Sequence, residues 1–354
     1  MDICFENKIC LDFLSKSENE KSFNVWLAER STSCSLILAE GFEERSLGLL
    51  KLIEKAGLKL DGLIIGRYTD DYELNIKYRS KLEEIASTVA PVHWKVIDNH
   101  NDGLWIKDAL CCLDSETIIL DITSMSNKGL FGCLDAALSS GRNIYIGYSE
   151  AKEYWPRKND WQQLARELNN AEKIADAVDT KPWLFSYEHS VGLVPNHEGY
   201  NSGGSRHALI AFLPFKSARL GAIIDQEDFS EYLFIAGCPH LEENRWRLDA
   251  LKKINESIIN NWPVIEMSTF GYLKTFEEMT KMLFSEDSLL HEYDIKLAIL
   301  GSKLQTVASW ALSCIIPSIT VITSTPAKYY PEAFSEGIGN SWIFKLPEPK
   351  IMQC

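Results

Sequence analysis

Short apolar runs alternate along the chain with longer segments in which apolar residues recur at helical spacing. The first cycle of this pattern spans 34–156. Near-continuous apolar strands between helices are typical of a parallel sheet covered on both faces, so the pattern predicts a five-stranded Rossmann-like α/β domain. The predicted strands are Ser35–Ala39, Gly62–Gly66, Trp94–Asp98, Thr117–Ile122 and Asn143–Tyr148, and the helices are Arg45–Ala56, Leu74–Val89, Leu104–Leu113 and Lys128–Ser139.

A second cycle with the same order follows at 207–334 and predicts a second Rossmann-like domain. Its predicted strands are Ala208–Leu213, Tyr232–Ala236, Val264–Met267, Lys296–Leu300 and Ile319–Ser324, and its clearest helices are Glu242–Ile259 and Phe276–Phe284.

Residues of the first cycle return in the second at a nearly constant distance along the chain. At an offset of 173 the matches are Leu36-Ile37 with Leu209-Ile210, Phe42 with Phe215 and Leu47-Gly48 with Leu220-Gly221; at 175 they are Ser149 with Ser324, Tyr154 with Tyr329 and Pro156 with Pro331. Matches at the first and the last strand with almost the same separation indicate an internal duplication. We therefore expect two tandem parallel-sheet domains that form a pseudo-dimer.

The remaining segments are an N-terminal arm (1–33), a connector (157–206) and a C-terminal strand with a tail (335–354). The connector begins with a predicted helix, Trp161–Ala177, and ends in a turn-rich loop, 194–204. That loop is either a flexible tether or a cover over a cleft between the halves.

Composition and charge narrow the class of protein. Of 354 residues 45% are hydrophobic and 11% aromatic, enough for substantial cores. The net charge of −14 leaves no large basic field, so non-specific DNA binding is not expected. Nine cysteines without a CxxC pair indicate a reducing cytoplasm. We see no secretion signal, and polar residues interrupt the most apolar stretch, Val307–Ile322, so we expect a soluble cytoplasmic protein that does not contact a membrane.

In a doubly wound parallel sheet, ligands bind beyond the carboxyl ends of the strands. After the first strand the chain carries Glu43, Glu44 and Arg45 in place of a glycine-rich fingerprint, which disfavours NAD or FAD. The two carboxylates either complement a helix dipole or bind a ribose hydroxyl, a base or a cation.

The loops after the fourth strands place hydroxyl groups and a lysine at a helix start. The first loop contains Ser124, Ser126 and Lys128, and the second contains Ser302, Lys303 and Gln305. Such residues bind a phosphate, or the serines cap their helices and the lysines are solvated. Neither loop fits GxxxxGK[ST], which excludes a P-loop nucleoside triphosphatase.

Three further candidates lie near other strand ends. Tyr148 ends the fifth strand, where an aromatic ring either stacks on a base or closes a core. Lys216 and Arg219 follow the first strand of the second half, at the position where the first half carries acidic residues. They would form a salt bridge between the halves or an asymmetric binding site.

Histidines and carboxylates also crowd the connector, but their spacing matches no familiar metal motif, so we predict neither a metal nor a cofactor. They are Glu188, His189, His197, Glu198 and His207.

The strand end Asp121-Ile122-Thr123, followed by small polar residues and Lys128, resembles the DxTxGTK region of CRISPR-associated Rossmann-fold (CARF) domains. Gly301-Ser302-Lys303 resembles the Gly-Thr-Lys part of the same region. Two such units in one chain resemble the SAVED domain of bacterial defence systems. This resemblance implies a sensor of cyclic oligonucleotides, bound across a pseudo-two-fold cleft by the loops after the first and fourth strands. The chain lacks both the RxxxxH and a well-placed PD-(D/E)xK nuclease motif.

These observations favour a binding module over an enzyme. The module would hold a nucleotide-like phosphorylated ligand, such as a cyclic oligonucleotide, in a cleft between the halves, and a protein partner would carry the effector activity. One alternative is a nucleotide- or nucleic-acid-processing enzyme that uses Glu43 or Glu44 and the loop Ser124–Lys128. A further alternative is a structural subunit of a defence complex.

Overall fold

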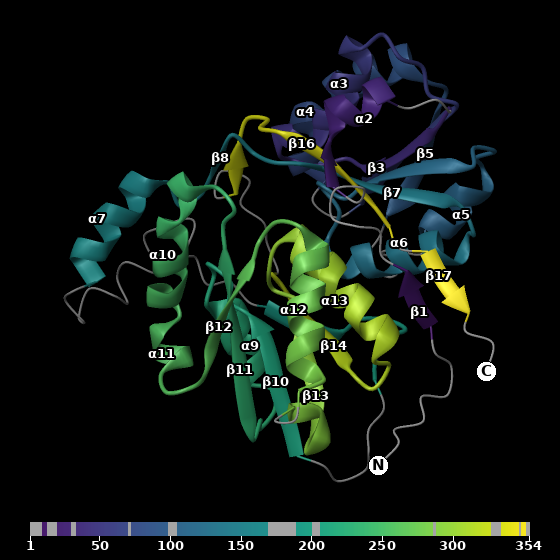
Figure 1. Ribbon diagram of the computed structural model, residues 1–354. Coiled ribbons are helices and arrows are strands. Elements are labelled where there is room, and N and C mark those ends of the chain that lie inside the picture. The colour runs from purple at the N-terminus through teal and green to yellow at the C-terminus, as the bar shows by residue number, and fades with distance from the viewer. Residues whose placement is uncertain are drawn as a thin grey trace. The chain divides into compact units, whose positions relative to one another are not determined.

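The computed structural model describes ten stretches of the chain and divides it into two compact units (Figure 1). The described residues are 9–12, 20–29, 33–69, 72–97, 105–168, 189–199, 206–285, 288–326, 334–346 and 348–351. Unit 1 comprises Met1–Tyr154 with Ser335–Cys354, and unit 2 comprises Trp155–Phe334. The chain therefore passes from one unit to the other twice, at 154/155 and at 334/335.

The main sheet of unit 1 has the strand order β2-β16-β7-β6-β3-β4-β5 within the described residues. Strands β3 to β7 are parallel, whereas β16 pairs antiparallel with both β7 and β2. The strands are β2 (Glu20–Ser22), β3 (Ser35–Ala39), β4 (Gly62–Tyr68), β5 (Val92–Ile97), β6 (Thr117–Asp121), β7 (Asn143–Ser149) and β16 (Ser341–Lys345). Two small pairs, β1 (Ile9–Asp12) with β17 (Glu348–Ile351) and β8 (Glu153–Tyr154) with β15 (Ser335–Glu336), complete its strands.

The sheet of unit 2 has the order β12-β11-β10-β13-β14-β9, with β9 antiparallel to β14 and the other pairs parallel. The strands are β9 (His189–Leu193), β10 (Arg206–Phe212), β11 (Glu231–Cys238), β12 (Val264–Ser268), β13 (Tyr293–Ala298) and β14 (Thr320–Pro326).

Helices cover both faces of each sheet (Figure 1). In unit 1, Leu36 and Leu38 of β3 pack in a core with residues of α3 and α4, while the intervening Ile37 faces the opposite side. In unit 2, Leu209 and Ala211 of β10 pack with residues of α9 and α10. Each fully buried aliphatic side chain contributes roughly 1.5–3 kcal/mol to the free energy of unfolding.

The helices of unit 1 are α2 (Phe23–Glu29), α3 (Gly48–Lys55), α4 (Tyr72–Val89), α5 (Trp105–Cys111) and α6 (Asn127–Ser139), with the 3-10 turn η1 (Glu44–Leu47). Those of unit 2 are α7 (Lys158–Leu168), α9 (Ala218–Ile224), α10 (Trp246–Ile254), α11 (Glu256–Ile259), α12 (Tyr272–Leu283) and α13 (Lys303–Ile315), with η2 (Glu242–Asn244) and η3 (Leu289–His291).

Both units place their five parallel strands in the same order. Numbered along the chain, the parallel strands of each unit lie as 3-2-1-4-5, with an antiparallel strand beside the fifth. The predicted class, two tandem Rossmann-like α/β domains, is confirmed, and the shared order is compatible with the predicted duplication. The order reverses between the first and fourth strands, β3 and β6 in unit 1 and β10 and β13 in unit 2, which defines a switch point in each sheet.

The sheets are wider than the predicted five strands. The arm supplies β2, the C-terminal segment supplies β16, and the connector supplies β9. β9 was not predicted because its sequence, His-Ser-Val-Gly-Leu, contains only two apolar residues, too few for the alternation to be distinguished from a loop. Some predicted features lie outside the described residues: Asp98, Leu104, the helix beyond Leu168, Glu188, the end of the loop (200–204) and the repeat at Tyr329 to Pro331.

Gly48 and Gly221 test this packing because they match at the sequence offset of 173 and each lies in a helix, α3 or α9. A Cβ atom added at Gly48 would lie 2.2 Å from Oγ of the buried Ser149, whereas one added at Gly221 would meet nothing within 4 Å. We expect Gly48→Ala to lower the free energy of unfolding by about 1–3 kcal/mol through overpacking. The matched Gly221→Ala should leave it unchanged or raise it by up to about 1 kcal/mol through helix propensity. Urea unfolding of both variants measures the difference, and equal effects would contradict the packing described.

Candidate functional site

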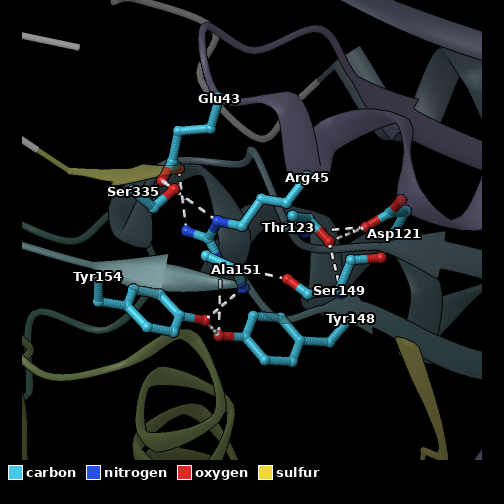
Figure 2. A network of polar contacts seen from close by, with 9 residues as sticks. All are labelled: Glu43, Arg45, Asp121, Thr123, Tyr148, Ser149, Ala151, Tyr154 and Ser335. Atoms are coloured by element: carbon cyan, nitrogen blue, oxygen red, sulfur yellow. Dashed lines mark hydrogen bonds and ion pairs between the residues drawn. The ribbon is translucent and has the colours of Figure 1, made fainter. Parts of the chain in front are cut away.

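A network of polar side chains lies at the carboxyl edge of the unit 1 sheet (Figure 2). It joins the segment after β3, the loop after β6 and the exit of β7 to the short strands β8 and β15. Because β3 and β6 flank the switch point of the sheet, the network occupies the edge where doubly wound folds bind ligands.

Arg45 is the centre of this network and is only 8% exposed. Its Nε and Nη2 donate to the two carboxylate oxygens of Glu43 at 3.2 and 2.9 Å, a bidentate ion pair. Its Nη1 donates to the backbone carbonyl of Ser149 and to the hydroxyl of Tyr148, both at 3.3 Å. Burial opposes the charged form, but Glu43 and the tyrosines Tyr154 and Tyr148 outweigh it and raise the pKa of Arg45 well above its ordinary value. The guanidinium therefore stays charged, and these contacts involve all three of its nitrogens.

Two tyrosines contact Arg45 directly, and a serine of β15 contacts its ion-pair partner Glu43. The hydroxyls of Tyr148 and Tyr154 lie 3.3 Å apart, and that of Tyr154 accepts the backbone N–H of Ala151 at 2.9 Å. The guanidinium carbon lies 5.8 and 5.6 Å from the two ring centres, which adds cation–π attraction. The hydroxyl of Ser335 donates to Glu43. Tyr148, a candidate for base stacking, is thus buried against Arg45.

Asp121, at the end of β6, is 2% exposed and is only half satisfied. Its Oδ1 accepts from the backbone N–H of Thr123 at 3.0 Å and from the Thr123 hydroxyl, while Oδ2 has no hydrogen-bond partner. The Thr123 hydroxyl in turn accepts the backbone N–H of Ser149 at 3.0 Å. Burial, opposed by the two hydrogen bonds from Thr123, raises the pKa of Asp121 to about 6.

The carboxylates after β3 all pair with cations. Glu40, 1% exposed, accepts from Arg79 at 2.8 and 3.1 Å and lies 3.4 Å from Arg67. Glu44, in the first turn of η1, pairs with Lys51 at 3.1 Å. With Glu43 held by Arg45, this acidic segment is neutralised by the protein itself.

The serines of the loop after β6 take structural positions at the start of α6. Ser126 is the N-cap, with its hydroxyl accepting the N–H of Gly129 at 2.8 Å, and its own N–H donates to the hydroxyl of Tyr68 at 3.0 Å. Ser124 packs against Gly41, where an added Cβ atom would lie 2.7 Å from the Ser124 Cβ. Lys128 is half-buried at the second position of the helix.

The matching helix of unit 2, α13, also begins at a serine cap. Ser302 and Gln305 form a capping box, in which the Ser302 hydroxyl accepts the Gln305 N–H at 3.2 Å and the Gln305 side chain accepts the Ser302 N–H at 2.9 Å. Gln305 is 2% exposed and also donates to the carbonyl of Ser268 at 3.0 Å, so it holds the loop together. Lys303 is the first residue of the helix.

Lys216 and Arg219 precede and open α9 in unit 2. Arg219 donates through Nε and Nη2 to the carbonyl of Ser324 at 3.1 and 2.7 Å. The Lys216 ammonium lies 4.6 Å from the ring centre of Phe334. The predicted site residues of each unit therefore gather at the carboxyl edge of its own sheet.

The connector histidines take separate positions. His197 hydrogen-bonds the buried Ser313 at 2.8 Å, and His207 contacts Glu227. Within the described residues no group of three histidine, cysteine or carboxylate side chains is placed to hold a metal ion. Nor does any helix of the described chain combine the length and apolarity needed to span a bilayer.

A hollow of about 690 Å³ lies at the opposite, amino edge of the unit 1 sheet. Its lining includes Ser35, Asp61, His93 and Thr117, which stand at or near the beginnings of β3 to β6. The hydroxyl of Ser115 donates to Asp61 at 2.8 Å across part of this lining. None of the residues predicted to bind a ligand lines it.

No protein-family model matches the chain, and no curated protein matches its sequence. Among solved structures, a type III CRISPR defence DNA nuclease activated by cyclic oligoadenylate aligns with 80% of this chain at 8% identity and a TM-score of 0.47. This chain covers 64% of that nuclease, less than two thirds of its length. The cytoplasmic domain of a prokaryotic cation chloride cotransporter aligns with 83% of this chain and 96% of its own, at 8% identity and a TM-score of 0.26. At these scores neither likeness identifies a site residue.

The sequence prediction missed several members of the network. Asp121 and Thr123 entered the prediction only as part of a motif, and Ser335 only as the start of the C-terminal strand and tail. For Ser149 the sequence held a signal, its repetition as Ser324 at the offset of 175. In the structure the backbone carbonyl of each serine accepts a hydrogen bond from an arginine. Ser335 carried no such signal, since its contact with Glu43 spans 292 residues.

The half-satisfied carboxyl of Asp121 predicts a pH-dependent stability. Because its folded pKa of about 6 exceeds the ordinary 3.8, the folded state holds the proton more tightly, and stability contributed by this group falls as pH rises from about 4 through 6. We expect Asp121→Asn, whose Oδ1 still accepts both hydrogen bonds, to be more stable than wild type above pH 7 by an amount on the order of 3 kcal/mol. The gain should vanish near pH 4.

Urea unfolding between pH 4 and 8 measures this difference, with Asp108→Asn on the exposed surface of α5 as the control. A gain for Asp121→Asn that does not change with pH, or that Asp108→Asn shares, would contradict the described environment.

Proposed function

We propose that the protein is a sensor that binds a nucleotide-type phosphorylated ligand at the carboxyl edges of its two sheets. One observation carries the proposal. In both units the fourth parallel strand leads into a 13-residue helix that starts at a serine cap and bears a lysine in its first two positions, Lys128 in α6 and Lys303 in α13. A helix N-terminus presents backbone N–H groups and a partial positive charge, and a lysine adds a full charge, so both ends suit a phosphate.

The surroundings in unit 1 support this role. The loops after β3 and β6 touch at Gly41 and Ser124, beside the switch point of the sheet. The carboxylates that precede α3 there, Glu43 and Glu44, are ion-paired with Arg45 and Lys51. They therefore set up little repulsion against an anionic ligand at the start of α6.

The same ion pairs favour binding over catalysis. The alternative enzyme would use Glu43 or Glu44 as an acid or base, yet each would first have to leave its cation. We therefore assign the effector activity to a protein partner. The resemblance of the two strand-end motifs to CARF and SAVED domains supports cyclic oligonucleotides as the ligand class, a duplicated origin for the units and a role in cytoplasmic antiviral defence.

The test is calorimetric titration with cyclic and linear oligoadenylates and mononucleotides. We expect one of these to bind, and Lys128→Ala and Lys303→Ala each to weaken it about 10-fold or more, because a hydrogen bond to a charged group contributes about 1.5–3 kcal/mol. Lys107→Ala on α5 and Lys281→Ala on α12 remove exposed lysines elsewhere in the two units and should bind as wild type.

Two results would end the proposal. One is the absence of binding by every nucleotide tested. The other is binding that both Lys128→Ala and Lys303→Ala leave unchanged.

A further inference from the structure

Three basic side chains of unit 2 gather near the end of β14. Lys216 comes from the segment between β10 and α9, Arg219 is the second residue of α9, and His189 is the first residue of β9. Burial, and then the charges of Arg219 and Lys216, lower the pKa of His189, which shows that the three groups lie within electrostatic reach.

Strand register places His189 on the α9 face of the sheet. In the antiparallel pair β9–β14, His189 lies opposite Pro326 and Val191 opposite Ser324. Side chains two residues apart on a strand point to the same face, and Val191 packs in the core that contains Leu220 of α9. His189 and Ser324 therefore share the face covered by α9.

Polar atoms on this face have no hydrogen-bond partner. Both ring nitrogens of His189 are buried without one, and so is the hydroxyl of Ser324, a residue that is fully buried. Buried polar groups in native proteins are almost always hydrogen-bonded. Three unsatisfied atoms beside two cations indicate a ligand that accepts hydrogen bonds and carries negative charge.

In unit 1 the corresponding place is occupied by a carboxylate of the protein itself, and an anionic ligand in unit 2 would take the position of that carboxylate. Arg45 donates to the carbonyl of Ser149 as Arg219 donates to that of Ser324, at 174 and 175 residues' distance along the chain. In unit 1 the segment before the arginine supplies the carboxylate of Glu43. In unit 2 the segment between Phe212 and Arg219 contains no carboxylate and supplies Lys216 instead.

We propose that Lys216, Arg219, His189 and Ser324 form an anion site that binds a phosphate group, either of a phosphate monoester or as the free ion. A phosphate offers enough acceptor oxygens to satisfy His189 and the Ser324 hydroxyl, and its negative charge is attracted to the two cations. This anion site uses residues other than those at the start of α13, and it does not depend on the proposed function.

Calorimetry with inorganic phosphate, adenosine monophosphate and adenosine tests the anion site. We expect phosphate or the monophosphate to bind the wild type, His189→Ala to weaken binding at least 10-fold and Ser324→Ala to weaken it several-fold. His93→Ala, which removes an exposed histidine of unit 1, should bind as wild type. Tighter binding of the monophosphate would identify an ester, and tighter binding of phosphate the free ion. Binding of adenosine as tight as that of the monophosphate would overturn the proposal.

A second measurement uses the unmodified protein and does not depend on the folding of a variant. Histidine-labelled protein gives the imidazole titration of His189 by NMR, assigned by comparison with His189→Ala. Because burial, and then the charges of Arg219 and Lys216, lower the pKa of His189, we expect this pKa to lie below its ordinary 6.5 without phosphate and to rise when phosphate is added. A titration that phosphate leaves unchanged would overturn the anion site. Lys303→Ala should leave this rise intact, so the two proposals fail separately.

Discussion

Both units depend on one contact, an arginine after the first parallel strand that donates to a backbone carbonyl at the end of the fifth. Arg45 makes it to Ser149, and Arg219 makes it to Ser324. The first and fifth strands are not neighbours, because the fourth lies between them. The contact therefore links the ends of the first and fifth strands across the end of the fourth. It fixes the relative positions of the loops at the edge where a ligand would bind. Packing alone does not require a charged side chain at this position, so the groups that surround each guanidinium are of interest.

The two units surround their arginine with different side chains. Unit 1 neutralises Arg45 with Glu43 and surrounds it with Tyr148 and Tyr154, which leaves a closed network with a permanent internal counterion. That network also holds Ser335, so it fixes both strands by which the chain leaves and re-enters unit 1. Unit 2 adds Lys216 at its corresponding segment. Unit 1 therefore carries an ion-paired anchor at the place where unit 2 carries a basic segment.

The sequence predicted the fold because central parallel strands such as β3 and β6 are fully buried. Runs such as Ser35–Ala39 and Thr117–Asp121 have no exposed position, so an unbroken apolar pattern marks them. Edge strands such as β9 carry mostly polar or exposed residues, and only pairing with β14 makes them strands. The same distinction holds for the site: the caps at Ser126 and Ser302 are local and follow from residue type, as one of the two open interpretations stated. Contacts such as Glu43 with Ser335, or His189 beside Arg219, depend on tertiary pairing that no local pattern records.

The central claim is that ligands bind at the carboxyl edges of the two sheets. Hydrogen–deuterium exchange of the whole protein, with and without inorganic phosphate and a panel of cyclic oligoadenylates, tests it most directly. We expect slower exchange at the starts of α6 and α13 and in the segment that leads into α9, with no change along the hollow that includes Ser35 and His93. Protection confined to that amino-edge hollow, or no protection with any of these compounds, would contradict it.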